Sequence, residues 1–504
     1  MPVDLLSAPR FQSQDLGLPL PDDPHAVSAC LPLWAHNIGY EEGDPAVISK
    51  LQAAYPRFCF HPTVQQLNEQ ILRDRQMCGL PFASRKAASR AIEYVQHAAG
   101  ADTEIQITPL ANQAAGGATG VSVHADVFSI LKQYWQHAGE NASSRVCELI
   151  LNETPATCSD TEDRRIVRNR VAAIQQTDVE NVFLFPSGMA AIAATWRTVQ
   201  QGWQGSTCQF GFPYVDTLKI QQRFPGAQHT FFPIGNDDDL ASLRQQCSTA
   251  PPTAVYCEVP TNPLLVTPNL LQLRQLADEY GFLLIVDDTL AACGNLEVLR
   301  VADVAVTSLT KYFSGYGNVL AGCMTLNPAG RHFERLHQLI AEDFEETLAD
   351  VDVSVVRHNS EDIAQRMKTI NSNAAELADL LQNDDRVEHV YYPSSASAEY
   401  ESLRAANGGY GGLLSIVLKS PADTTPQVFD ALEVCKGPNL GTNFTLCCPY
   451  TILAHYTELD FAEQCGVSRW LLRISVGTEP VEELKRRFLS AFATASSDSQ
   501  ELLR

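Results

Sequence analysis

The sequence of 504 residues lacks the features that mark several common classes of protein. No apolar run approaches the length of a membrane-spanning helix, and the first 25 residues have neither a basic n-region nor an apolar h-region. The net charge of −23 disfavours nucleic acids and anionic membrane surfaces as partners. Neither heptads nor a repeat of fixed period is present. We therefore expect a cytoplasmic protein with no membrane span and no nucleic-acid partner.

The cysteines also lack the patterns that would give them a special role. None of the 14 forms a CxxC pair or follows the Cys/His spacing of a metal site. Cys447 and Cys448 are adjacent, which disfavours an ordinary disulfide between them. Reduced thiols and no bound metal are the expectation.

The chain is long enough to divide into several units. Residues 1–24, rich in proline and polar side chains, are expected to form a poorly ordered N-terminal arm. We expect an N-terminal region over residues 25–120 and a large α/β domain over residues 121–345. A smaller α+β domain with an antiparallel sheet is expected over residues 346–504.

The middle of the chain shows the clearest alternation of strands and helices. Residues 254–259 (AVYCEV), 282–286 (FLLIV) and 302–306 (ADVAV) are predicted strands, and the apolar second one is typical of a strand covered on both faces. Between the first two, Thr267 and Pro268 predict a helix start and Gly281 a helix end. The order indicates an open α/β sheet, in which ligands bind beyond the carboxyl ends of the strands.

Polar side chains follow these three strands. In chain order they are Asn262, Asp287, Asp288, Ser308, Thr310 and Lys311. Because the carboxyl ends of parallel strands lie at one edge of a sheet, we expect an amide, carboxylates, hydroxyls and an amine to meet there.

An earlier predicted strand, residues 181–185, leads into Ser187, Gly188 and Met189 at the start of a helix. Glycine allows an anion to approach the backbone closely, and a helix N-terminus favours negative charge. We therefore expect a phosphate to be held by these N–H groups and by the hydroxyls of Ser308 and Thr310.

The lysine beside this phosphate site allows two interpretations. In a P-loop it would follow its glycines directly, but the pattern GxxxxGK[ST] is absent. A lysine on a separate strand, with an aspartate at a neighbouring strand end, suits pyridoxal 5'-phosphate. That cofactor needs an amine for its aldehyde and a carboxylate for its ring nitrogen. Each feature alone also fits a turn or a helix cap, but their combination favours the cofactor.

With these residues in view, the chain resembles the Cys/Met-metabolism family of pyridoxal-phosphate enzymes, and most of all the fungal-type cystathionine γ-synthases. The match runs from residue 25 almost to the C-terminus. It rests on the motifs YPRF, SRKAASR, FPSGMAAI, FPYVDTLKI, CEVPTNPLL, IVDDT, SLTKYFSG, GPNLGTNFTLCCPYTILAHY and LRISVG. The resemblance implies the fold-type I architecture, a mostly parallel central sheet flanked by helices with a smaller C-terminal α+β domain.

The resemblance also implies roles for the matched residues. Lys311 would form the Schiff base and shuttle protons, Asp287 would pair with the pyridine nitrogen, and Tyr214 would stack on the ring and assist catalysis. Asn262 would bind the ring hydroxyl. The phosphate would be bound by Gly188, Met189, Ser308 and Thr310.

Other implied roles concern the substrate and the partner subunit. Tyr55 and Arg57 match residues that reach the cofactor phosphate of a neighbouring subunit, which implies a homodimer or homotetramer with shared active sites and partner contacts from residues 25–120. Tyr55 would also contact substrate. Arg473 matches the arginine that grips the substrate α-carboxylate; a strand-edge charge is the alternative, but an arginine inside LLRISV is costly without a partner.

The implied activity is γ-replacement on an O-acylhomoserine, with O-acetyl-L-homoserine as the expected substrate and a second, nucleophilic substrate. Cysteine as nucleophile would give cystathionine; a carbon nucleophile, as in specialised metabolism, and a γ- or β-lyase are the alternatives. A non-catalytic role is disfavoured by the intact cofactor residues. Three departures leave the nucleophile open. Asn439, a substrate-site position, stands where the family usually has serine, and Tyr316-Gly317 replace an acidic residue and serine. Small residues follow the aspartates in VDDTLAACGN, where larger ones such as Phe are common.

Overall fold

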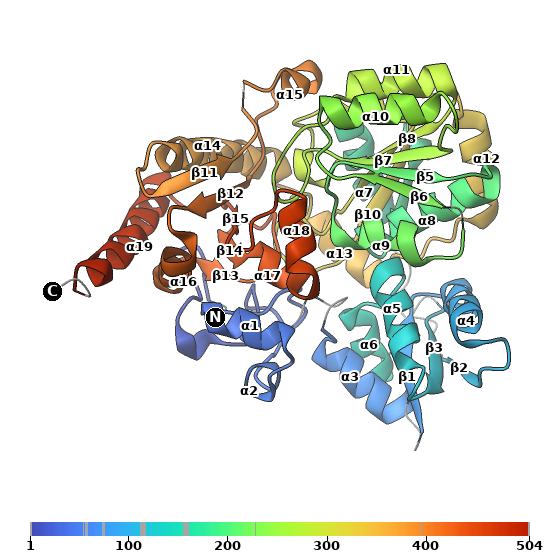
Figure 1. Ribbon diagram of the computed structural model, residues 1–504. Helices are drawn as coiled ribbons and strands as arrows, with labels where there is room; N and C mark the ends of the chain where they lie inside the picture. Colours follow the sequence, from blue (N-terminus) through green and yellow to red (C-terminus); the bar gives the residue numbers. More distant parts are fainter. Residues whose placement is uncertain are drawn as a thin grey trace.

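The computed structural model describes residues 3–53, 55, 59–72, 76–110, 117–154, 161–226, 228–394 and 396–501, with side chains up to residue 494. Within these ranges the strands form three sheets, with three, seven and five strands from the N-terminal to the C-terminal part of the chain (Figure 1). None of the described helices is both long and apolar enough to cross a membrane.

The central sheet has seven strands in the order β4-β10-β9-β8-β7-β5-β6. The pairs β6–β5, β5–β7, β7–β8 and β8–β9 are parallel, whereas β10 is antiparallel to both β4 and β9. The bounds are β4 Val182–Phe185, β5 Thr207–Phe210, β6 His229–Phe232, β7 Ala254–Glu258, β8 Leu283–Asp287, β9 Val304–Thr307 and β10 Gly322–Leu326. The expectation of a mostly parallel α/β sheet is confirmed.

Both faces of this sheet are covered. Alternate residues of β7 enter two different apolar clusters, Tyr256 on one face and Val255 on the other. This is the packing expected of strands that are apolar throughout. The surrounding helices are α7 Thr161–Gln175, α8 Gly188–Gly202, α9 Val215–Arg223, α10 Asp237–Cys247, α11 Leu270–Tyr280, α12 Phe333–Asp343 and α13 Asp350–Asn359.

Helix α11 begins later than its sequence predicts. Asn269, rather than Thr267, is the N-cap, and its side chain accepts a hydrogen bond from Gln272 N at 3.1 Å. Pro268 therefore precedes the helix instead of opening it. The predicted end is confirmed, because Gly281 follows the helix with φ +82°.

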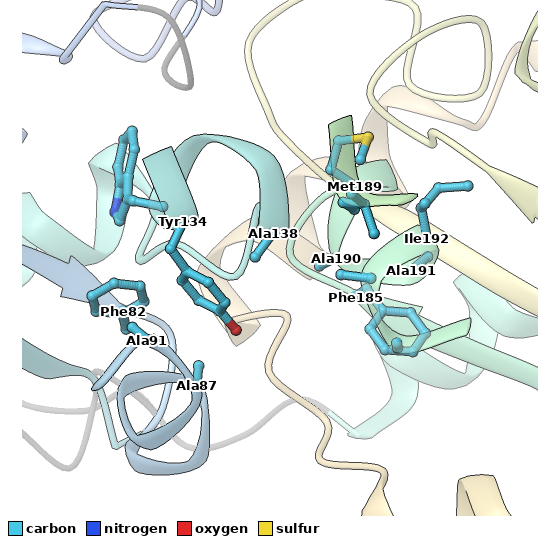
Figure 2. Close-up of a cluster of buried hydrophobic side chains, with 14 of the residues drawn as sticks. Phe82, Ala87, Ala91, Tyr134, Ala138, Phe185, Met189, Ala190, Ala191 and Ile192 are labelled. Atoms are coloured by element: carbon cyan, nitrogen blue, oxygen red, sulfur yellow. The ribbon is translucent and has the colours of Figure 1, made fainter. Parts of the chain in front are cut away.

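The three-stranded sheet joins the central one through one apolar cluster (Figure 2). Phe82 and Tyr134 come from the N-terminal side and Phe185 and Met189 from the central side. Strand β3 (Thr119–His124) lies between β1 (Met77–Phe82) and β2 (Ile105–Pro109). The expected boundary at residues 120 and 121 therefore falls inside a sheet, because β3 pairs with the strands before it. The helices here are α1 Trp34–Glu41, α2 Pro45–Ile48, α3 Pro62–Leu67, α4 Arg85–Ala99, α5 Phe128–Ala138 and α6 Ser144–Leu151.

The C-terminal unit is built on the five-stranded sheet, in the order β11-β12-β15-β14-β13. Its pairs are antiparallel except β13 with β14, as expected for an α+β unit. The strands are β11 Val387–Tyr391, β12 Leu413–Leu418, β13 Cys435–Lys436, β14 Leu446–Pro449 and β15 Leu472–Ser475. The helices are α14 Ile363–Gln382, α15 Ala398–Leu403, α16 Pro421–Ala431, α17 Tyr450–His455, α18 Leu459–Gln464 and α19 Val481–Glu501.

Residues 3–24 differ from the poorly ordered arm that their composition suggests. Leu5 and Leu20 are buried in a cluster with Phe444 and Leu446 of the C-terminal unit. Arg10 pairs with Asp22 at 2.6 Å. Apolar residues spaced along a polar segment thus anchor it on the five-stranded sheet, because their burial offsets the entropy of ordering the chain.

Candidate active site

The carboxyl ends of β7, β8 and β9 and the N-terminus of α8 open onto one cavity. Its walls include every predicted site residue except Arg57 and Asn439: Tyr55, Gly188, Met189, Tyr214, Asn262, Asp287, Ser308, Thr310, Lys311 and Arg473. Asn439 lies directly behind the wall and touches Lys311. Arg57 lies outside the described residues.

Lys311, which follows β9, is held by residues that are far away in the sequence. Its Nζ donates hydrogen bonds to Asn439 Oδ1 at 2.5 Å and to the Tyr55 hydroxyl at 3.2 Å. The same nitrogen lies 4.5 Å from the centroid of the Tyr55 ring. The side chain is 9% exposed. An amine with these neighbours is oriented yet still faces the cavity, as a covalent or proton-carrying group requires.

Asp287 is the last residue of β8, and Thr289 N donates to its Oδ1 at 3.0 Å. Burial raises the pKa of the Asp287 carboxyl. Burial also raises the pKa of the neighbouring Asp288 to about 6, although Thr307 and Gln175 donate hydrogen bonds to it. A carboxylate in so dry a place needs a cation, and a protonated ring nitrogen could supply one.

The start of α8 provides a cradle for an anion. Ser187 caps the helix by accepting from Ala190 N at 3.0 Å. A Cβ added to Gly188 would lie 2.8 Å from Ser308 Cβ, so glycine is needed for the strand end and the helix N-terminus to lie so close. The Thr310 hydroxyl both donates to Ala321 O and accepts from Ala321 N. The geometry therefore favours Ser308 over Thr310 as a side-chain donor to a phosphate.

Tyr214 immediately precedes α9, and a residue that the sequence analysis missed supports it. Tyr214 N donates to Glu258 Oε2 at 2.6 Å. Burial, and secondarily the charge of Asp287, raise the pKa of the Glu258 carboxyl well above its usual range. Glu258 also lines the cavity. An acidic residue at the end of the apolar run AVYCEV was the signal that could have identified it.

Arg473, in β15, enters the cavity from the C-terminal unit. Its Nη1 donates to Asn262 Oδ1 at 3.3 Å, and its Nη2 donates to Pro438 O at 2.8 Å. The guanidinium carbon lies 4.7 Å from the centroid of the Tyr450 ring. Arg473 thus finds the partners that its buried position requires. They are the oxygens of Asn262 and Pro438 and the face of the Tyr450 ring, rather than a carboxylate.

Tyr450 is a second residue that the sequence analysis missed. It lines the cavity, and its side chain is 4% exposed. Its hydroxyl has no hydrogen-bond partner among the described residues. A buried donor without a partner at the wall of a cavity could bind a ligand. Tyr450 is the first residue of α17 and follows Pro449, a position that gave no sequence signal for ligand binding.

The position of Tyr55 bears on the expectation of shared sites. Its hydroxyl contacts Lys311 of its own chain. A single chain thus already places this side chain beside Lys311, and its supply to a neighbouring subunit stays a prediction.

Taken together, the groups fit pyridoxal 5'-phosphate. An amine, a half-buried carboxyl with a raised pKa and a glycine-lined helix start face one cavity. These correspond to the aldehyde, the ring nitrogen and the phosphate of that cofactor.

Comparisons with known proteins agree with this chemistry. Residues 157–493 match the family described as Cys/Met metabolism PLP-dependent enzyme, and residues 63–143 match the fungal trans-sulfuration enzyme N-terminal domain. A cystathionine gamma-synthase of Neurospora crassa is 32% identical, over 96% of this chain and 99% of its own. The cystathionine gamma-synthase-like enzyme iboG2 of Amanita muscaria is 33% identical, over 95% of this chain and 96% of its own.

Solved structures have the same fold. A cystathionine gamma synthase from Xanthomonas oryzae pv. oryzae superposes with a TM-score of 0.59 at 22% identity, covering 68% of this chain and 89% of that one. The fold-type I architecture is therefore confirmed. The chain belongs to the Cys/Met metabolism family of PLP-dependent enzymes, and its cofactor is pyridoxal 5'-phosphate.

Proposed function

We propose that this protein replaces the γ-substituent of an O-acylhomoserine, O-acetyl-L-homoserine, with a nucleophile. One observation carries the proposal: Lys311 and the guanidinium of Arg473 face the same cavity. A proton-carrying amine and a carboxylate-binding fork are what an amino-acid substrate needs at its Cα. The names of the relatives from Neurospora and Amanita support the same chemistry.

The residues that would hold the cofactor all line one cavity. When bound, pyridoxal phosphate supplies an electron sink that stabilises negative charge at the substrate Cα. Lys311 would bind its aldehyde, and Asp287 would keep its ring nitrogen protonated. Tyr214 would stack on the ring and Asn262 would bind its hydroxyl. The phosphate would be held by the N–H groups of Gly188 and Met189 and by Ser308, with Thr310 behind them.

Arg473 would orient the amino-acid substrate by binding its α-carboxylate. Its two contacts, with Asn262 Oδ1 and Pro438 O, fix the plane of the guanidinium before substrate arrives. A fixed fork loses little entropy when it binds a carboxylate at two points. Tyr55 and Asn439 would complete the substrate side, because both lie against the Lys311 amine.

Lys311 would move the protons. Its Nζ would take the proton from Cα and pass it on to the bound cofactor, which frees the amine to take a proton from Cβ. The acyl group would then leave Cγ as a carboxylate, with the electron pair of the broken C–O bond. The nucleophile would add its electron pair at Cγ, and Lys311 would return the protons to Cβ and Cα. One base on a flexible side chain can serve these adjacent carbons because the distances between them are short.

A product assay tests the proposal. Purified protein, loaded with pyridoxal phosphate, is incubated with O-acetyl-L-homoserine alone and then with cysteine, and products are identified by mass spectrometry. We expect acetate and cystathionine, formed only with both substrates and not by Lys311→Ala. Oxobutyrate and ammonia without an added nucleophile would instead indicate a lyase, and no product at all would contradict the proposal.

A carbon nucleophile is the second candidate. Apolar residues cover much of the cavity wall, namely Val215, Leu290, Leu320, Leu440, Leu453 and Ala454. Such a wall suits a co-substrate with a single charge better than the two charges of cysteine. Acetoacetate in the same assay tests this alternative, and a new C–C adduct in place of cystathionine would support it.

The oligomeric state is also a proposal. By resemblance we propose a homodimer or a homotetramer, with Arg57 completing the phosphate site of a neighbouring subunit. Sedimentation velocity of the holoenzyme is expected to give a species of at least two chains. A monomer with full activity would contradict the sharing of sites.

A further inference from the structure

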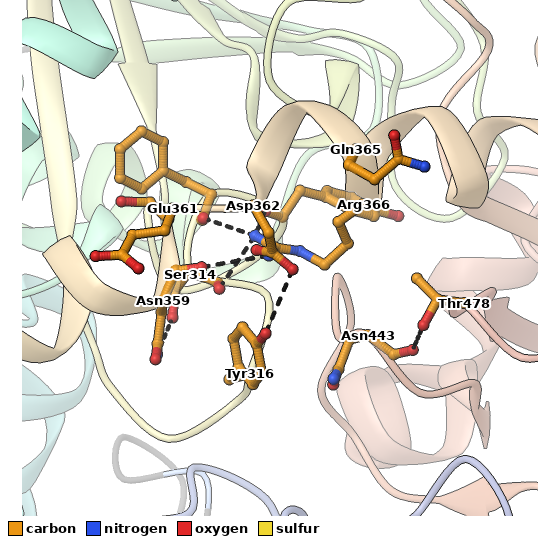
Figure 3. A network of polar contacts seen from close by, with 12 residues as sticks. Ser314, Tyr316, Asn359, Glu361, Asp362, Gln365, Arg366, Asn443 and Thr478 are labelled. Atoms are coloured by element: carbon orange, nitrogen blue, oxygen red, sulfur yellow. Dashed lines mark hydrogen bonds and ion pairs between the residues drawn. The ribbon is translucent and has the colours of Figure 1, made fainter.

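The turn that follows Lys311 is held by a buried arginine of the C-terminal unit (Figure 3). Arg366, in α14, is 3% exposed. Its Nη2 donates to the carbonyl oxygens of Tyr312, Phe313 and Ser314 at 3.1, 3.0 and 3.2 Å. The cation thus gathers three consecutive carbonyls that begin one residue after Lys311. Burying a guanidinium is costly unless it finds acceptors, and these carbonyls, together with Asn359 O at 3.3 Å from Nη1, supply them.

A glycine of the same turn lies against the guanidinium of Arg366. Gly315 has φ +77°, and a Cβ added there would lie 2.2 Å from Arg366 Nε. Gly315 N donates to Lys311 O at 2.7 Å, and Asn443 N donates to Gly315 O at 2.7 Å. A displacement of Arg366 would therefore reach the Lys311 backbone through a single hydrogen-bonded turn.

Two further side chains hold the guanidinium in place. Asp362, the N-cap residue of α14, forms an ion pair with Arg366 in the first turn of the helix. Tyr316 lies with its ring centroid 5.4 Å from the guanidinium carbon, and its hydroxyl donates to Asp362 Oδ2 at 3.4 Å. Figure 3 shows these three side chains meeting beside Ser314. The arginine is thus fixed from α14 and from the turn itself.

We propose that Arg366 is a positioning residue for Lys311. By fixing the carbonyls of residues 312–314 it sets the direction in which the Lys311 side chain leaves the backbone. It thereby sets the place of Nζ between Asn439 and Tyr55. The inference rests on the proposed function in one respect, which is that Lys311 is the amine that binds the cofactor and carries the protons.

Arg366→Gln in the holoenzyme tests this role. We expect the pH midpoint of the cofactor absorbance to shift and kcat to fall by about 10²-fold, because a misplacement of about 1 Å costs this much. The KM for O-acetyl-L-homoserine should change little, since Arg473 is untouched. The matched control is Arg487→Gln in α19, a buried arginine that pairs with Glu483 and donates to Leu6 O. It should lower the melting temperature without changing the midpoint or kcat.

A second pair of variants covers the case in which Arg366→Gln does not fold. Gly315→Ala pushes on Arg366 and should reproduce the shifted midpoint and the reduced kcat. Gly281→Ala is its control, because that residue also has a positive φ, +82°, but the nearest atom to its added Cβ is 4.0 Å away.

Two results overturn the inference. In the first, Arg366→Gln and Gly315→Ala have a lower melting temperature, as the controls do, but both keep the wild-type kcat and the wild-type pH midpoint of the cofactor absorbance. In the second, the wild-type protein shows no absorbance band of a cofactor bound to Lys311. This result would overturn the proposed function as well, whereas the first would leave it standing.

Discussion

The central sheet and the C-terminal unit contribute to the cavity in different ways. The sheet supplies Asp287 and Lys311 from the ends of neighbouring strands, so parallel topology alone brings these groups together. The C-terminal unit supplies Arg473, which lies 211 residues from its partner Asn262, and Asn439, which lies 128 residues from its partner Lys311. Under the proposed function, cofactor chemistry would be set within one sheet, whereas substrate orientation would depend on how two units pack together.

The largest effect on activity is expected from a substitution of Asp287, at the end of a strand of the central sheet. Asp287→Asn removes the negative charge that would keep the cofactor ring nitrogen protonated, and kcat/KM should fall by about 10³-fold. Steady-state kinetics with saturating cofactor measure this. Asp288→Asn is the matched control, because Asp288 is bonded to Thr307 and Gln175 instead of lining the cavity. Equal activity of the two variants would contradict the role of Asp287.

Asp288, which follows the same strand, should make the stability of the protein depend on pH. The pKa of Asp288 is raised from 3.8 to about 6 in the folded protein, so the folded state binds this proton more tightly than the unfolded chain. This contribution to stability is present below pH 4 and is lost as the pH rises through 6. At ~1.4 kcal/mol per pKa unit it amounts to about 3 kcal/mol.

Melting temperatures between pH 4 and pH 7 measure this contribution. Asp288→Asn should gain stability relative to the wild type as the pH rises from 4 to 6, and the difference should then level off. A difference that is constant with pH would show that Asp288 does not titrate in this range.

Arg473→Lys tests the side of the site that the C-terminal unit provides. A lysine cannot bind a carboxylate at two points, so KM for O-acetyl-L-homoserine should rise by about 10²-fold while the cofactor absorbance stays unchanged. Arg469→Lys, at a half-buried arginine paired with Glu463 and Asp460, should leave KM unchanged. Loss of cofactor with an unchanged KM would assign Arg473 to the cofactor instead.

The smallest effect is expected where the two regions touch, at Asn439. Asn439→Ser removes the oxygen that accepts from Lys311 and leaves more room, so the ratio of products in competition between cysteine and acetoacetate should change by about 10-fold. Stability should change little, because Asn439 Nδ2 has no partner among the described residues. Asn269→Ser, which replaces one helix cap by another, is the control. An unchanged product ratio would remove Asn439 from the choice of nucleophile.

This contrast also explains what could be predicted from sequence. Asp287 and Ser308 were identified because each ends an apolar run that reads as a buried strand. Arg473 and Asn439 were identified only by resemblance, since no spacing rule links β15 to the end of β9. Glu258 was missed although an acidic residue inside the apolar run AVYCEV marked it. Tyr450 and Arg366 were missed because their roles depend on contacts between distant segments rather than on local pattern. The packing of residues 3–24 was missed for the same reason.

The most direct test of the account is to find which lysine carries the cofactor. Purified holoenzyme is reduced with borohydride and digested, and the peptides are sequenced by mass spectrometry. The account predicts one phosphopyridoxyl group, on Lys311, and no label in Lys311→Ala. A label on another lysine, or an unlabelled wild-type protein, would contradict it.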